Sequence, residues 1–330
     1  MSSASRPVIV EMIPFRIEPQ FVSRVWGWND LRPWYERGPE REPIGEVWLT
    51  GDDCQVATGT HAGKTLASLF EEFPQAILGP AAQSAGSPLL VKVIFAREKL
   101  SVQVHPDDRL AQKYGQPRGK TECWYALTAE PEAKVAVGLL PGVTMDKVKQ
   151  GIDHGTLEES LNIISVDPGD LIFVDAGTVH AIWPGSVLLE TQQNCDLTYR
   201  MYDYGRGREL HIDKSIEATR LQTRAGKIPP QALSDRTVLV ESNYFVVEKI
   251  PVEVSRSSAS LRRAIESTPT LFYLFAVSGS GRISSPSFAP IDLPARGIIA
   301  VPSSSPVFAI QDMGGLELIR IAPRNPEMTA

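Results

Sequence analysis

The chain has few cysteines and no long apolar run. Its 330 residues include three cysteines, Cys54, Cys123 and Cys195, which are odd in number and widely spaced. This pattern indicates reduced thiols and excludes a disulfide framework or a Cys-x-x-Cys metal site. No stretch reaches the roughly 18 consecutive apolar residues of a membrane span, and the first twenty residues lack the apolar core of a signal peptide. We therefore expect a cytoplasmic protein without a membrane partner.

An excess of positive charge is also missing. The sequence contains 33 lysines and arginines against 39 aspartates and glutamates, which gives a formal net charge of -6. Such a balance argues against nucleic acid as a partner, although it leaves room for a local basic pocket. The apolar and charged fractions, 42% and 22%, are those of an ordinary globular protein. Nucleic acid is therefore not expected as the main partner.

Histidine is scarce and unevenly distributed. The chain has five histidines, and from Arg236 onward it contains neither histidine nor cysteine. Short apolar runs separated by Ser, Gly and Pro clusters predict a β-sandwich or barrel in this region. The length allows two domains. We predict an N-terminal domain of residues 1–230 and a C-terminal β domain of residues 231–330 without metal ligands, in a monomer or small homo-oligomer.

The N-terminal domain is expected to combine strands with short helices. Apolar stripes predict helical segments at about residues 65–78, 144–163 and 213–223. Thr65 and Asp213 are suitable N-caps for the first and last of them. The remaining pattern alternates between apolar and polar residues and is typical of strands.

A strand at residues 100–106 carries the first candidate site residues. Leu100, Val102 and Val104 point to one face, so Gln103 and His105 point together to the other. An imidazole beside an amide oxygen supplies two ligands for a divalent metal. The others must come from strands that return to the same place.

Lys92 interrupts the apolar run of residues 89–95. It is either an edge lysine whose ammonium extends to solvent, or a buried lysine in a polar pocket. In the second case it needs an anionic partner to offset the cost of burial.

A second motif indicates His180 as another candidate residue of the metal site. The spacing Gly169-x5-Asp175-x-Gly177-x2-His180 resembles the second cupin motif, with aspartate in place of the usual proline. Gln103-x-His105 resembles the first cupin motif with its leading histidine replaced by glutamine. The resemblance implies a double-stranded β-helix, or jelly-roll barrel. Of the five histidines, only His105 and His180 lie on predicted strands, whereas the other three have loop or helix-cap contexts: His61, His154 and His211.

Longer segments narrow the resemblance to one family. LLVKVIF, LSVQVHPDD, GKTECWYAL, GDLIFVDAGTVHAIWPGSVLLETQQNCDLTYRMYDY and RELHIDKSIEA resemble, in order, the signatures of type I mannose-6-phosphate isomerases of the short bacterial form. This family resemblance implies a mainly β protein with two jelly-roll (cupin) barrels and short helices in the N-terminal part.

The resemblance also implies one zinc ion per chain, with Gln103, His105, Glu122 and His180 as its ligands. Two imidazoles, a carboxylate and an amide oxygen suit a catalytic zinc with open positions. Gln103 is the poorest donor of the four and could be peripheral. Without the resemblance, each histidine alone could be a core or surface residue and Glu122 an ordinary strand carboxylate.

The implied reaction interconverts mannose 6-phosphate and fructose 6-phosphate by proton transfer between C1 and C2 through an enediolate. Matching positions make Arg200, Lys120 and Glu190 the expected catalytic residues. Lys92, Lys120 and Arg200 are the expected substrate-binding residues. Which group removes the proton stays open, and a structural ion pair is the alternative role for Arg200 and Glu190.

Two other functions use the same scaffold. An iron-dependent cupin oxygenase also employs two histidines and a carboxylate, and a non-catalytic cupin could bind a sugar phosphate. The oxygenase would not require Lys92, Lys120 and Arg200 together. Loss of a metal ligand or of Arg200 would have suggested the sugar-phosphate-binding protein, and neither has occurred. The isomerase is therefore the favoured interpretation.

Overall fold

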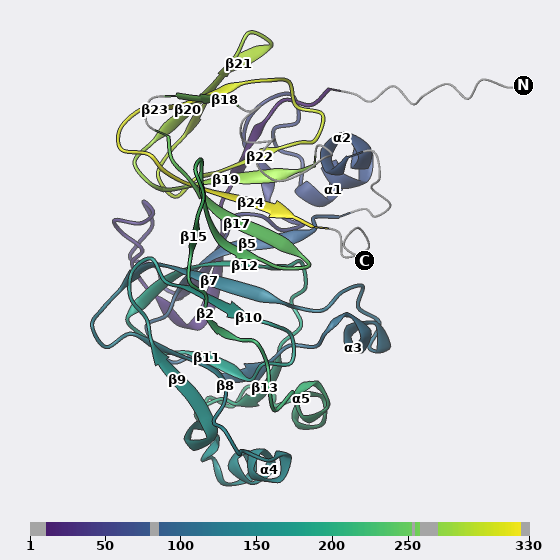
Figure 1. The fold of residues 1–330 in the computed structure, drawn as a ribbon, viewed down its shortest axis with the longest axis vertical. Helices are drawn as coiled ribbons and strands as arrows, with labels where there is room; N and C mark the ends of the chain where they lie inside the picture. The colour runs from purple at the N-terminus through teal and green to yellow at the C-terminus, as the bar shows by residue number, and fades with distance from the viewer. Residues whose placement is uncertain (1–10, 80–85, 253–254, 258–269, 325–330) are drawn as a thin grey trace, which may run out of the picture. The chain divides into compact units, whose positions relative to one another are not determined.

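The computed structural model describes residues 11–79, 86–252, 255–257 and 270–324. The protein is mainly β, with most strands in four sheets (Figure 1). Two compact units divide the chain. The first unit contains Met1–Pro19, Leu49–Ser87 and Gln231–Ala330, and the second contains Gln20–Trp48 and Pro88–Pro230.

The second unit contains all the predicted site residues on or beside two sheets. The seven-stranded sheet has the order β14 (Gly226–Lys227), β10 (Leu171–Val174), β7 (Glu122–Ala129), β12 (Ser186–Gln193), β5 (Leu89–Phe95), β3 (Ile44–Trp48) and β2 (Gln20–Trp28). The five-stranded sheet has the order β13 (Tyr199–Tyr202), β6 (Val102–Val104), β11 (His180–Ile182), β8 (Lys134–Leu139) and β9 (Leu161–Ser165).

One apolar core joins the inner faces of these two sheets. Ile94, Trp124 and Leu188 come from the seven-stranded sheet, and Val135 and Ile182 come from the five-stranded sheet. Because side chains alternate along a strand, the even-numbered residues of β5, β7 and β12 share this inner face. Lys92, Glu122 and Glu190 therefore lie on the same face as the apolar core.

Helices cover the outer face of the five-stranded sheet (Figure 1). Val102, Val104 and Ala181 of the sheet pack with Val148 of α4 (Met145–His154) and Ala218 of α5 (Ile212–Ala218). A 3₁₀ turn at Leu157–Ser160 follows α4, and a short helix, α3 (Asp108–Lys113), follows β6. The outer face is therefore apolar and packs against helices, whereas Gln103, His180 and Arg200 of this sheet lie on the inner face.

The first unit is built in the same way from two sheets and one apolar core. Its eight-stranded sheet has the order β15 (Gln231–Ala232), β16 (Thr237–Glu241), β17 (Phe245–Ile250), β24 (Glu317–Pro323), β19 (Phe272–Ser278), β22 (Ile298–Val301), β1 (Phe15–Glu18) and β4 (Gln55–Val56). The four-stranded sheet has the order β18 (Ser255–Ser257), β23 (Ala309–Asp312), β20 (Gly281–Ser285) and β21 (Phe288–Leu293). Closure of each pair of sheets into a barrel stays a prediction.

Several details differ from the sequence-based expectations. The described residues before Gln20 and between Leu49 and Ser87 belong with the C-terminal strands, because β1 pairs with β22 and β4 pairs with β1. The first helical segment consists of α1 (Leu66–Glu72), capped by Thr65, and α2 (Pro74–Leu78). The expected segment 144–163 ends earlier, since β9 begins at Leu161. The last helix stops at Ala218, and its N-cap is His211 instead of Asp213.

No helix among the described residues is both long and apolar enough to cross a membrane.

Candidate functional site

Strand pairing places Gln103, His180 and Arg200 side by side. Gln103 of β6 is directly opposite His180 of β11 on one side and Arg200 of β13 on the other. Residues opposite each other in an antiparallel pair project from the same face. His105, two positions after Gln103, follows on that face. Glu122 begins β7 on the facing sheet, so the two sheets together bring in the donors.

His105, Glu122 and His180 form a buried group whose candidate ligand atoms all lie within 4.8 Å of one another. His105 Nε2 is 3.5 Å from Glu122 Oε2, and His180 Nε2 is 3.4 Å from Glu122 Oε1. Each of the three residues is 1% exposed. Three of the four ligands implied by the resemblance are therefore brought together.

Backbone carbonyls orient both imidazoles. Nδ1 of His105 donates to the carbonyl of Leu197 at 2.7 Å, and Nδ1 of His180 donates to the carbonyl of Thr178 at 2.9 Å. A proton on Nδ1 leaves Nε2 with a free lone pair, which is the arrangement of metal-bound histidines. Burial lowers the pKa of His105 well below its usual range and that of His180 to about 4, so both imidazoles are neutral near pH 7.

The residues present fit a divalent cation. Two imidazole nitrogens face a carboxylate, which is a donor set that binds divalent cations. The Lys120 ammonium lies beside them, 3.1 Å from His105 Nε2 and 3.3 Å from Glu122 Oε2. Glu122 Oε2 is buried and has no hydrogen-bond partner. A mixed nitrogen and oxygen set suits zinc, and also iron or manganese.

Gln103 lies beside this group and contacts it with its side-chain nitrogen. Its Nε2 donates to His180 Nε2 at 3.2 Å, while its Oε1 accepts from the Ser101 hydroxyl at 3.2 Å. Ligation through the amide oxygen requires the amide plane to turn over. Its role as a ligand stays a prediction.

A chain of alternating charges continues from the group into the core. Glu46 is followed by Lys92 at 3.4 Å, Glu190 at 3.6 Å, Lys120 at 3.7 Å and Glu122 at 3.3 Å, each distance joining a lysine Nζ to a carboxylate oxygen. All five residues are buried. Lys92 therefore has two anionic partners and does not extend to solvent, which excludes the edge-lysine interpretation.

The environment shifts the pKa values of three of these side chains, and the shifts differ in direction. Burial and the nearby Glu122 raise the pKa of Glu190 to about 8, despite the two lysines. Burial opposes ionisation of Glu46, but Lys92 and Arg24 outweigh it and lower the Glu46 pKa to about 2. Burial also works against the charge on Lys120, yet Glu122 and Glu190 raise its pKa above the usual range. Lys120 is therefore an ammonium at neutral pH, whereas the raised pKa of Glu190 favours its protonated form.

The Glu46 pKa predicts how acid weakens this part of the core. A pKa depressed from 4.5 to about 2 contributes stability that is complete above pH 4.5 and lost as the pH falls toward 2. The difference in unfolding free energy between wild type and Glu46→Gln should therefore shrink by about 3 kcal/mol across this window. Urea unfolding at stepped pH measures it, with the exposed Glu42→Gln as control. A difference that does not change with pH contradicts the assignment.

Arg200 lies on the inner face of the five-stranded sheet, opposite Gln103, but it is not part of the series of ion pairs from Glu46 to Glu122. Its Nη1 donates to the carbonyl of Glu209 at 2.8 Å, and its Nε is buried without a hydrogen-bond partner. Among the described residues it makes no ion pair with Glu190, whose ionic partners are Lys92 and Lys120. The alternative role in a structural ion pair therefore stays open for Glu190, which pairs with the two lysines, and gains no support for Arg200.

Sequence reasoning missed several polar residues near the site. Gln192 is opposite Glu122 and Trp124 is opposite Glu190; the Oε1 of Gln192 and the Nε1 of Trp124 are buried without hydrogen-bond partners. Both residues lie two positions from a predicted site residue on the same strand, which is the signal that could have found them. Arg206 follows β13, 3.1 Å from Asp203, and its terminal nitrogens are also buried without a hydrogen bond.

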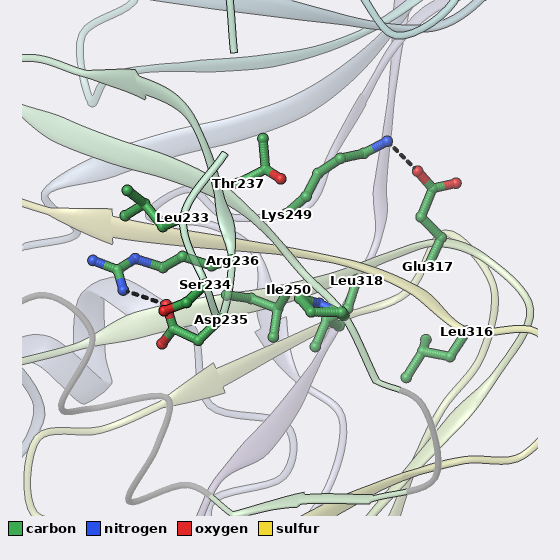
Figure 2. Close-up of a pocket in the computed structure, with 11 residues that line it drawn as sticks. Leu233, Ser234, Asp235, Arg236, Thr237, Lys249, Ile250, Leu316, Glu317 and Leu318 are labelled. Carbon is green, nitrogen blue, oxygen red and sulfur yellow. Dashed lines mark hydrogen bonds and ion pairs between the residues drawn. The ribbon is translucent and has the colours of Figure 1, made fainter. Parts of the chain in front are cut away.

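A separate cavity lies in the first unit. It has a volume of about 320 Å³ and is lined by residues of β16, β17 and β24 and the turns next to them. Figure 2 shows that its charged side chains pair with one another, Arg236 with Asp235 and Lys249 with Glu317. Since it has no histidine or unpaired charge in its lining, we place the candidate site in the second unit.

The chain is similar to known proteins over most of its length. Residues 15–145 match the family model described as phosphomannose isomerase type I, catalytic domain. The chain is 35% identical over 285 residues to the probable mannose-6-phosphate isomerase GmuF of Bacillus subtilis, covering 82% of this chain and 87% of the relative. It is 34% identical to the mannose-6-phosphate isomerase of Streptococcus mutans, with the same coverage of both chains.

A solved structure of a mannose 6-phosphate isomerase is also similar to this chain. The crystal structure of the mannose 6-phosphate isomerase from Bacillus subtilis superposes with a TM-score of 0.82 at 30% identity, covering 94% of this chain and 99% of that one. The fold, the buried His-Glu-His group and these relatives agree: the chain belongs to the type I mannose-6-phosphate isomerase family.

Proposed function

We propose that the protein is a zinc-dependent isomerase that interconverts mannose 6-phosphate and fructose 6-phosphate. The observation that carries the proposal is the meeting of His105, Glu122 and His180 with a buried lysine–glutamate–lysine series at one end of an apolar core. This arrangement combines a cation site with groups that can move a proton and hold negative charge. When bound, zinc supplies Lewis-acid polarisation of a substrate oxygen.

Glu190 is the proposed proton carrier. A general base works best when its pKa lies near the working pH, and the Glu190 pKa is raised to about 8. At neutral pH its carboxyl therefore exists in both forms and can take a proton from one carbon and return it to the other. This assigns the base that the sequence left open.

Lys120 and Lys92 act differently in this proposal. Lys120 stays charged and lies 3.1 Å from His105 Nε2, so it donates hydrogen bonds to the negative charge that develops on the substrate oxygens of the enediolate. Lys92 is held between Glu46 and Glu190. Its main task is to fix the Glu190 carboxylate, with substrate contact as a secondary role.

Arg200 is the proposed anchor for the substrate phosphate or enediolate. It lies on the inner face opposite Gln103 and carries a buried Nε without a hydrogen-bond partner. A guanidinium keeps its charge and can hold two oxygens at once.

The distribution of residues supports a metal-free C-terminal part. Residues 231–330 contain no histidine or cysteine, so we propose one zinc per chain, held by the second unit. All three cysteines are free and buried, which is compatible with a cytoplasmic enzyme whose thiols stay reduced.

An assay with mannose 6-phosphate tests the function. The purified protein is mixed with the substrate while fructose 6-phosphate and dissolved oxygen are recorded together. We expect fructose 6-phosphate to form without oxygen uptake. Oxygen uptake without isomerisation would support the iron-dependent oxygenase, and substrate binding without turnover would support a sugar-phosphate sensor.

A further inference from the structure

Gln193 connects segments that carry three site residues. It is the last residue of β12 and is 4% exposed. Its Oε1 accepts a hydrogen bond from the backbone N–H of Thr121 at 2.9 Å, and its own backbone N–H donates to the Thr121 carbonyl at 3.1 Å. Thr121 stands between Lys120 and Glu122. Gln193 therefore fixes the start of β7 from two sides.

The other end of the Gln193 side chain reaches Asp108. Gln193 Nε2 donates to Asp108 Oδ1 at 2.9 Å, and the same oxygen accepts the backbone N–H of Gly119 at 2.7 Å. Asp108 comes three residues after His105, and Gly119 immediately precedes Lys120. One carboxylate oxygen thus ties together the two ends of the loop formed by residues 106–119.

The two ends of this loop are in direct contact. The N–H of Lys120 donates to the Pro106 carbonyl at 3.0 Å. A Cβ added to Gly119 would lie 2.5 Å from both the Pro106 carbonyl oxygen and the Asp107 carbonyl carbon. Any shift of one segment is therefore passed to the other.

We infer that Gln193 is a positioning residue that fixes His105, Lys120 and Glu122 relative to one another through Asp108 and Thr121. The inference rests on the proposed function and adds a residue to its machinery. The donors come from separate segments, and a functional site needs its groups within about 0.5 Å of the productive geometry. The Gln193 side chain hydrogen-bonds to both the loop after His105 and the backbone between Lys120 and Glu122.

Gln193→Leu removes both side-chain hydrogen bonds with little change of volume. We expect zinc affinity, measured by competition with a chromophoric chelator, to fall about 10- to 100-fold, as for other residues that orient metal ligands. At saturating zinc, kcat should fall at least about tenfold, because small misplacements of catalytic groups are costly. KM should stay within about threefold, since Arg200 and Lys92 lie on other segments.

A reciprocal exchange provides the rescue. Gln193→Glu keeps an acceptor for Thr121 but places a carboxylate against Asp108, and it should weaken zinc binding as the leucine variant does. Adding Asp108→Asn removes the repulsion between the two carboxylates, so the double variant should bind zinc more tightly than Gln193→Glu. The recovery should be partial, because the atom that replaces Asp108 Oδ1 cannot both donate to the carboxylate at position 193 and accept from the Gly119 N–H. Tyr114→Phe is the matched control, because it removes a 2.6 Å hydrogen bond to Glu217 from the same loop, away from Gln193.

The possible outcomes distinguish the positioning role of Gln193 from the proposed isomerase function. Zinc affinity and kcat unchanged in Gln193→Leu would overturn the inference, and so would an equal loss in Tyr114→Phe. If the leucine variant does not fold by circular dichroism, the comparison of Gln193→Glu with the double variant decides the question, and no recovery overturns the inference. A wild-type protein without isomerase activity whose zinc affinity still depends on Gln193 would reject the proposed function and retain the inference.

Discussion

Substitution of His180 by alanine is expected to abolish metal retention and turnover together. His180 supplies one of two imidazole nitrogens to the buried group, and its Nε2 faces Glu122 at 3.4 Å. Loss of a residue that merely orients a metal ligand costs 10- to 100-fold in affinity, so loss of a ligand should cost more than about 100-fold. Metal content after dialysis and the rate of isomerisation are the two measurements.

His154→Ala is the control for the loss of a histidine. His154 is the exposed last residue of α4 and should be dispensable for both metal and activity. Wild-type zinc stoichiometry in dialysed His180→Ala would remove His180 from the ligand set. The proposed metal centre would then need a different third donor.

Glu190→Gln should keep its metal and lose most of its turnover. The amide has nearly the same shape as the carboxyl but cannot accept the carbon-bound proton. General-base catalysis contributes about 10²- to 10⁴-fold, so kcat should fall by that factor. Because Glu190 is outside the His105, Glu122 and His180 group, zinc content should be unchanged.

Proton exchange gives this prediction a readout of its own. In heavy water, the wild type should wash deuterium into the C2 position of mannose 6-phosphate, as NMR can follow, and Glu190→Gln should not. Glu132→Gln, an exposed carboxyl between β7 and β8, is the control. Turnover within tenfold of wild type in Glu190→Gln would transfer the role of base to another group.

The local part of the site could be predicted from the sequence. Alternation along residues 100–106 placed Gln103 and His105 on one face, and the structure places Gln103 beside His180 through strand pairing. The family resemblance supplied Glu122 and His180, which the structure brings next to His105. Burial of Lys92 likewise followed from one of the two interpretations of its apolar strand.

The parts that depend on distant pairing could not be predicted. Glu46 contacts Lys92 because β3 lies next to β5, and nothing in the sequence near either residue specifies that register. Gln193 meets Asp108 across 85 positions. Likewise, Phe15 pairs with Ala300, so residues at the N-terminus join the C-terminal strands. Local periodicity shows which face a side chain occupies but not which strand lies next to it.

The most direct test of the account is to remove the metal and restore it. The purified enzyme is treated with a chelator and dialysed, and zinc is then added in steps while the conversion of mannose 6-phosphate and the metal bound per chain are measured. We predict that activity disappears on chelation and returns in proportion to zinc, reaching its plateau at one ion per chain. Full activity in metal-free protein, or restoration by iron but not by zinc, would contradict the account.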